Sequence, residues 1–171
     1  MPEEDVFPDR NMSHRDKVVF MLEREGWALD AVPTRTDLDP PFPRYAYTIG
    51  FEDRFGFPEV CIVGLSPVAC RGLFDLVADA LAGGTELPIG DAFIGLLEGE
   101  QPCALLPVDP ETTADLFPSL TEHEQLAGRS PDGFRMVQLT WPDGAGVLPG
   151  ERGFAANLLA VQLLLGEVPA S

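Results

Sequence analysis

The stretch RYAYTIGFEDRFGFPEVCIVGL, residues 44–65, decides the fold of this chain. Large and small side chains alternate through residues 44–51, and this period of two predicts a β-strand whose side chains point to opposite faces in turn. The face with small side chains lets a packed helix or a ligand approach the backbone closely. The large side chains are Tyr45, Tyr47, Ile49 and Phe51, and the small ones are Ala46, Thr48 and Gly50.

The second half of this stretch predicts a central strand followed by a helix. Residues 59–65 are apolar almost without interruption, which is typical of a strand that is buried on both faces. Ser66 then offers a helix N-cap, and Pro67 suits the first helical position. Apolar residues recur at helical spacing until Gly83 and Gly84. We therefore expect two strands and a helix in direct succession.

Outside residues 44–84, the sequence predicts further helices and strands in mixed order, which indicates an α+β fold. We expect a mostly antiparallel sheet of five or six strands, with helices packed on one side. The length of 171 residues is usual for one domain, so we expect a flexible acidic segment at residues 1–12 and a single α+β domain at residues 13–171. The further elements are a helix after Ser13, strands at 27–31 and 134–141, a proline-rich loop at 33–43, a hairpin of 93–97 with 103–108, short helices within 110–127 and a helix at 155–165.

Acidic residues dominate the charge of the chain, with 28 Asp and Glu against 11 Lys and Arg and a formal net charge of -17. No Lys or Arg occurs between Arg71 and Arg129. Nucleic acids and anionic membranes are bound largely through Lys and Arg, so neither is expected as a partner. Such a charge would attract a basic protein or a cationic ligand, although it is also explained by a role in solubility alone.

Residues that usually hold metals or cofactors are sparse. Cys61, Cys70 and Cys103 have apolar neighbours and form no Cys-x-x-Cys pattern, so we expect buried free thiols. His14 and His123 have no second histidine at helical spacing, so no metal site is expected. No glycine-rich phosphate-binding pattern lies between a strand and a helix, and we expect no cofactor.

No export or membrane signal is evident, and a cytoplasmic location is expected. The acidic N-terminus lacks the hydrophobic run of a signal peptide. No stretch reaches the roughly 18 apolar residues of a membrane-spanning helix.

Glu59 is the candidate general base. It follows Pro58 directly and begins an otherwise apolar strand, so its carboxylate must find a partner or take a raised pKa. A buried carboxylate with a raised pKa is suited to general-base catalysis. The alternative is structural: Glu59 caps the strand or pairs with Arg44 or Arg54.

Two further polar residues stand out near the C-terminal end of the chain. Asp143 lies in a Trp-Pro-Asp-Gly turn, where it either forms the turn or joins a site. Gln138 lies inside an apolar strand, so its amide needs a buried partner or a ligand.

Two blocks of sequence resemble a bacterial family that is catalogued as domain of unknown function number 4262. The blocks are YTIGF (47–51) with GFPE (56–59), and QLTWPD (138–143), and the resemblance covers roughly residues 27–151. Phe57 stands where members of the family usually carry a histidine, and residues 148–151 replace their aromatic-rich ending. The family name implies no function, but its motif positions point to a site.

We expect the two blocks to meet at one pocket. Glu59 and Asp143 would be its catalytic groups, and the other motif residues would bind the ligand. These ligand-binding candidates are Tyr47, Gly50, Gln138 and Trp141.

Three functions remain open, and whether the chain is an enzyme is not decided by its sequence. The first is a binding or accessory module that recognises a basic protein or a small ligand. The second is a small metal-independent enzyme that uses Glu59 as general base. The third is a flavin- or other cofactor-binding β domain, since residues 47–65 with the following helix are loosely similar to flavin-binding split barrels.

Overall fold

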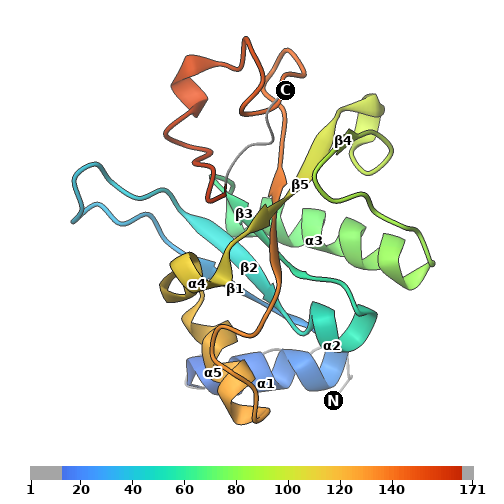
Figure 1. Cartoon of the computed structure of the whole chain (residues 1–171), viewed down its shortest axis with the longest axis vertical. Coiled ribbons are helices and arrows are strands. Elements are labelled where there is room, and N and C mark those ends of the chain that lie inside the picture. Colours follow the sequence, from blue (N-terminus) through green and yellow to red (C-terminus); the bar gives the residue numbers. More distant parts are fainter. Residues whose placement is uncertain (1–12, 167–171) are drawn as a thin grey trace, which may run out of the picture.

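The structure is a computed structural model that describes residues 13–166. Its centre is one sheet in the strand order β1-β2-β3-β6-β5-β4 (Figure 1). All neighbouring strands are antiparallel except β3 and β6, so the α+β class and the mostly antiparallel sheet are confirmed. The strands are β1 (Ala28–Val32), β2 (Tyr45–Ile49), β3 (Glu59–Val63), β4 (Ala92–Phe93), β5 (Cys103–Val108) and β6 (Met136–Thr140).

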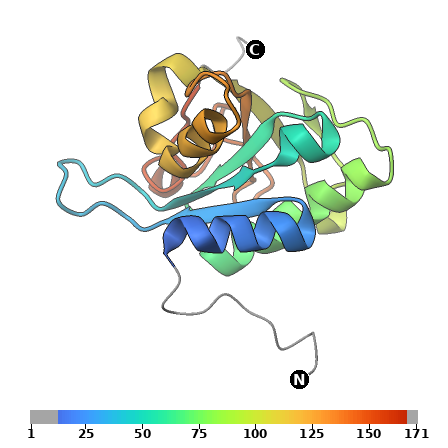
Figure 2. The same cartoon turned by 90° about the horizontal axis from the view of Figure 1, so that it is seen from below.

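Helices cover both faces of this sheet, whereas the sequence led us to expect them on one side (Figure 2). Helix α3 (Pro67–Ala82) packs on one face, and α5 (Pro118–Leu126) packs on the other. Helix α1 (His14–Glu25) runs along the edge formed by β1. Cover on both faces is needed because β2, β3 and β6 are buried at every position.

The predicted strands at residues 44–51 and 59–65 are confirmed as β2 and β3, and a short helix connects them. Gly50 ends β2 with a positive φ of 104°, and α2 (Phe51–Phe55) follows at once. Ser66 caps α3 as predicted, because its hydroxyl accepts the N–H of Ala69. The remaining short helices are η2 (Glu98–Glu100), α4 (Pro110–Thr113), η3 (Ala114–Leu116) and η4 (Ala156–Leu158).

The predicted helix at residues 155–165 does not form. Only η4 is helical there, and the rest of the segment is irregular. The side-chain amides of two glutamines hold this segment against the end of β6. Gln138 bonds to the main chain of Leu163 and Leu165, and Gln162 bonds to the main chain of Trp141.

Residues 33–43, which we call the arm, connect β1 to β2 and project away from the sheet (Figure 1). Main-chain bonds between Arg35 and Phe42 hold its two sides together. The expected flexible segment at residues 1–12 lies outside the described residues. Within residues 13–166, no helix combines the length and the hydropathy needed to cross a bilayer.

Candidate functional site

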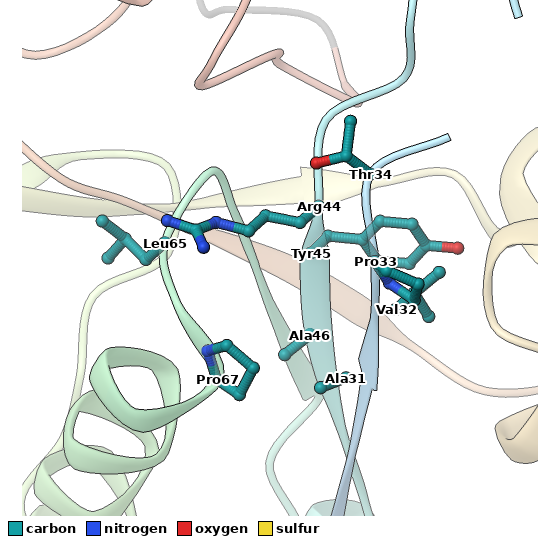
Figure 3. A pocket seen from close by; sticks show the side chains of 9 residues that line it. All are labelled: Ala31, Val32, Pro33, Thr34, Arg44, Tyr45, Ala46, Leu65 and Pro67. Carbon is teal, nitrogen blue, oxygen red and sulfur yellow. The ribbon is translucent and has the colours of Figure 1, made fainter. Parts of the chain in front are cut away.

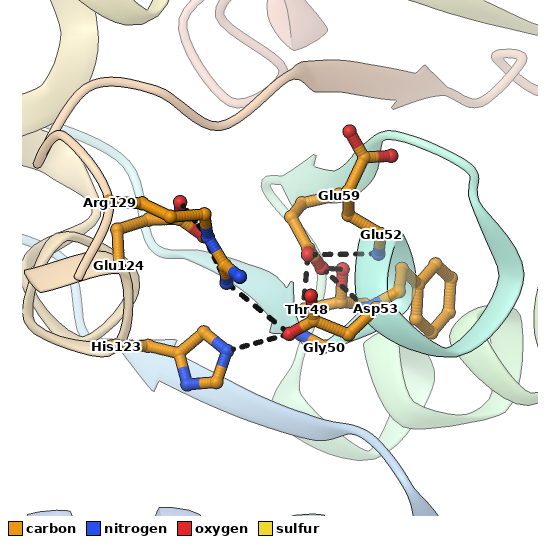
Figure 4. A network of polar contacts seen from close by, with 9 residues as sticks. Thr48, Gly50, Glu52, Asp53, Glu59, His123, Glu124 and Arg129 are labelled. Atoms are coloured by element: carbon orange, nitrogen blue, oxygen red, sulfur yellow. Dashed lines mark hydrogen bonds and ion pairs between the residues drawn. The ribbon is translucent and has the colours of Figure 1, made fainter. Parts of the chain in front are cut away.

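Glu59 is buried at the start of β3, with 2% of its surface exposed, and its carboxylate accepts four hydrogen bonds (Figure 4). The Thr48 hydroxyl and the N–H of Phe51 donate to Oε1 at 2.8 and 3.0 Å. The N–H groups of Gly50 and Glu52 donate to Oε2, each at 3.2 Å. Glu59 therefore caps the N-terminus of α2, where Gly50 has no side chain to do so.

The environment of Glu59 acts on its pKa in two opposite directions. Burial raises the pKa to about 7, while the four hydrogen bonds favour the ionised form and limit the rise. Neither Arg44 nor Arg54, the predicted structural partners, forms an ion pair with Glu59. The carboxylate is instead occupied by Thr48 and the main chain.

Gly50 and Tyr47, two predicted ligand-binding residues, have structural contacts here. A Cβ at Gly50 would lie 2.9 Å from a Leu22 methyl group and 3.0 Å from the Gly26 carbonyl oxygen. The Tyr47 hydroxyl is buried, donates to Asp30 and accepts the N–H of Ser119. Burial raises the pKa of Tyr47 far above its usual range, and Asp30 adds to this effect.

Asp143 closes the turn after β6. Its carboxylate accepts the N–H groups of Ala145 at 2.9 Å, Val147 at 3.0 Å and Ala155 at 2.8 Å. The bond from Val147, joined by those from Ala155 and Ala145, lowers the pKa of Asp143 below its ordinary value.

Gln138 and Trp141 hold the C-terminal segment. The Gln138 amide donates to the Leu163 carbonyl and accepts the N–H of Leu165. The Trp141 indole donates to the Val63 carbonyl, and the Trp141 main chain makes two bonds with Gln162.

The structure does not bring the two sequence blocks to one pocket. Gly50 and Glu59 lie together at one end of β3. Met136 is the register partner of Glu59, and Thr140 lies about 13 Å further along β6 at the usual rise per residue. Asp143 follows beyond Thr140, so the carboxylates of Glu59 and Asp143 lie at opposite ends of the sheet.

Polar networks that the sequence did not reveal fasten α5 to the rest of the fold. His123 lies 3.0 Å from the Asp53 carboxylate, which also accepts a hydrogen bond from Arg129 at 3.4 Å (Figure 4). Arg129 in turn makes two bonds with the buried Glu124.

A second network joins the other end of α5 to α1 and β1. His14 contacts both Ser119, at 2.8 Å, and Asp30, at 3.2 Å. These residues are far apart in sequence, and no spacing rule connects them. No cluster of three or more His, Cys, Asp or Glu side chains suited to a metal ion occurs within residues 13–166.

A hollow of about 340 Å³ lies where the arm leaves the sheet, and we call it the arm-base hollow (Figure 3). Ala31 and Ala46 are register partners on β1 and β2 and form its floor. Pro67, at the start of α3, and Leu65 form one wall. The complete lining is Ala31, Val32, Pro33, Thr34, Arg44, Tyr45, Ala46, Leu65 and Pro67.

Ala46, one residue of the small face predicted for residues 44–51, lies beside Ala31 of β1, and these two alanines leave the space that larger side chains would fill. Arg44 is the only charged residue in the lining, and its side chain extends from β2 across the hollow toward Leu65 (Figure 3). Arg44 makes no ion pair with any residue of the described chain. The N–H of Gly64 donates a hydrogen bond to the Arg44 carbonyl, and this bond holds the main chain from which the Arg44 side chain extends.

A family model described as "Domain of unknown function (DUF4262)" matches residues 21–155, which include every residue that lines the arm-base hollow. No curated protein and no solved structure matches the chain.

Proposed function

The chain belongs to the domain-of-unknown-function family DUF4262, and from this premise we propose that it is a binding module that holds a small anionic ligand in the arm-base hollow. The observation that carries the proposal is Arg44, an exposed cation without an ion-pair partner in residues 13–166, beside an apolar hollow. Binding sites for small molecules are commonly apolar hollows with one or a few placed polar groups.

The chemistry of the lining favours binding over catalysis. The hollow offers a guanidinium, the Thr34 hydroxyl and aliphatic carbon, but its lining contains no carboxylate, histidine or thiol to act as base or nucleophile. The Tyr45 hydroxyl is engaged elsewhere, since it donates to the Leu116 carbonyl. Glu59, the predicted base, does not line this hollow.

A guanidinium selects anions with two oxygens. Its planar array of N–H groups matches carboxylate or phosphate oxygens in pairs. The net charge of -17 disfavours anions in general, so the one cation of the hollow must supply the local attraction.

The proposal is tested by nuclear magnetic resonance titration with a panel of small carboxylates and phosphates. We expect saturable shifts in the backbone signals of residues 31–34 and 44–46 with at least one anion. Arg44→Met should weaken that binding roughly tenfold or more, since hydrogen bonds between charged groups contribute about 1.5–3 kcal/mol.

Two further variants serve as controls. Ala31→Leu, at an exposed position of the floor, should block binding by filling the hollow, while Arg152→Met, at an exposed arginine outside the hollow, should leave it unchanged. The proposal fails if no anion in the panel shifts these signals, or if Arg44→Met binds as well as the parent protein.

A further inference from the structure

A second hollow lies next to the first, between α1 and α3. It measures about 350 Å³ and is more open. Four of the five residues that line it are apolar, and one of them, Val68, has 84% of its surface accessible. The lining is Met21, Leu29, Pro67, Val68 and Arg71.

The two hollows lie side by side along β1, and we call them together the trough. Pro67 lines both of them. Leu29, which lines the second, and Ala31, which lines the first, are two residues apart in β1 and therefore lie on the same face, about 7 Å from each other. A ligand that fills both hollows would therefore cross from one to the other beside Pro67.

The two ends of this trough differ in charge. Arg71, at the second hollow, already binds both carboxylate oxygens of Glu25 at 2.8 Å and contacts Asp75 at 3.3 Å. Its guanidinium also lies 4.8 Å from the centre of the Trp27 ring. Arg44, at the first hollow, has no such partners, so the trough offers one available cation at one end and apolar surface at the other.

We propose that the trough binds a single-chain amphiphile, with an anionic headgroup at Arg44 and an unbranched aliphatic tail that passes Pro67 and lies over Leu29, Met21 and Val68. This inference rests on the proposed function and names the class of ligand. A free amphiphile is favoured over a lipid surface because the charge of -17 repels anionic membranes.

A series of straight-chain carboxylates tests the inference, from butanoate to decanoate, each below its micelle concentration. The affinity should rise about two- to fourfold per added methylene as the tail becomes buried. Val68→Ser should weaken decanoate binding at least threefold and leave butanoate binding unchanged. Leu76→Ser is the matched control, because Leu76 is a partly exposed apolar residue of the same helix that lines neither hollow.

The outcomes separate this inference from the proposed function. Two results would exclude the amphiphile but leave the proposed anion binding in the arm-base hollow intact. One is that butanoate binds at Arg44 but affinity does not rise with chain length, and the other is that Val68→Ser binds decanoate normally. If no carboxylate of any length binds at Arg44, the proposed function itself fails. The last measurement uses anionic lipid vesicles. Binding to the vesicles that exceeds binding to monomeric decanoate would overturn the assignment to a free ligand.

Discussion

Glu59 shows how a single buried carboxyl group serves this fold. Its carboxylate gathers donors from the end of β2 and the first turn of α2, and so fixes the sharp connection between them. The same burial that makes a carboxylate suitable as a base also makes it suitable as a cap. The geometry favours the cap, because both oxygens already have two donors each.

Replacing Glu59 by glutamine tests the cap. The amide nitrogen of Gln accepts no hydrogen bond, so two of the four donors would face another donor. At pH 5 we expect Glu59→Gln to lower the free energy of unfolding by about 1–3 kcal/mol, measured by urea denaturation. Glu52→Gln, the control, removes a half-exposed ion pair with Arg135 and should cost less than about 1 kcal/mol. Equal losses in the two variants would contradict the assigned role.

The pH dependence of this loss follows from the raised pKa of Glu59. Burial raises that pKa to about 7 from its ordinary value of 4.5, so the folded state holds the proton more tightly than the unfolded state. The stabilisation is fully present below pH 4.5 and is lost as the pH rises through 7. The stability difference between the parent protein and Glu59→Gln should therefore shrink from pH 5 to pH 8. A difference that grows with pH would show that hydrogen bonding outweighs burial.

Among the elements, the C-terminal segment departs most from its local sequence preference. Its Ala- and Leu-rich composition favours a helix, yet Gln138 and Gln162 hold it in an irregular conformation. The close approach at Gly64 supports this docking, because a Cβ there would lie 2.5 Å from the Val161 carbonyl oxygen. Leu159, Val161 and Leu163 remain partly exposed as a result.

Replacing Gln138 by methionine should loosen this segment without unfolding the sheet. The change keeps the size of the side chain but leaves the Leu163 carbonyl and the Leu165 N–H without their partners, at a cost of about 1–3 kcal/mol. Hydrogen exchange should quicken in residues 155–166 and stay slow in β2 and β3. Gln125→Met, at an exposed position of α5, should change neither. Unchanged exchange in Gln138→Met would show that packing alone holds the segment.

At the scale of the whole molecule, charge works against compactness. The net charge of -17 gives a long-range self-repulsion that opposes the compact state, and we expect it to exceed what the local ion pairs offset. Most of these pairs are partly exposed and each contributes little.

Salt should therefore stabilise the protein. Raising NaCl from 0.01 to 0.5 M at pH 7 shortens the Debye length from about 30 Å to a few ångströms, and we expect Tm to rise by several degrees. The same titration near the isoelectric point of about 4.2 is the control, and the effect should nearly vanish there. A Tm that falls with salt at pH 7 would mean that ion pairs dominate over repulsion.

Local patterns in the sequence determined the central unit of this protein. The alternation through residues 44–51, the apolar run at 59–65 and the cap at Ser66 each depend on neighbours in the chain, and β2, β3 and α3 confirm them. The small face of β2 was likewise predicted, and its Ala46 forms part of the floor of the arm-base hollow. The family resemblance was also readable, since its motifs are short and contiguous.

Only the tertiary structure decided where the charged groups lie in the fold. The parallel pairing of β3 with β6 set Glu59 and Asp143 at opposite ends of the sheet, although their motifs belong to one family pattern. Strand register likewise set Arg44 beside two alanines, and contacts across more than twenty residues held the C-terminal segment out of a helix. Register and long-range hydrogen bonds arise from packing between distant segments, and a local pattern carries no information about that packing.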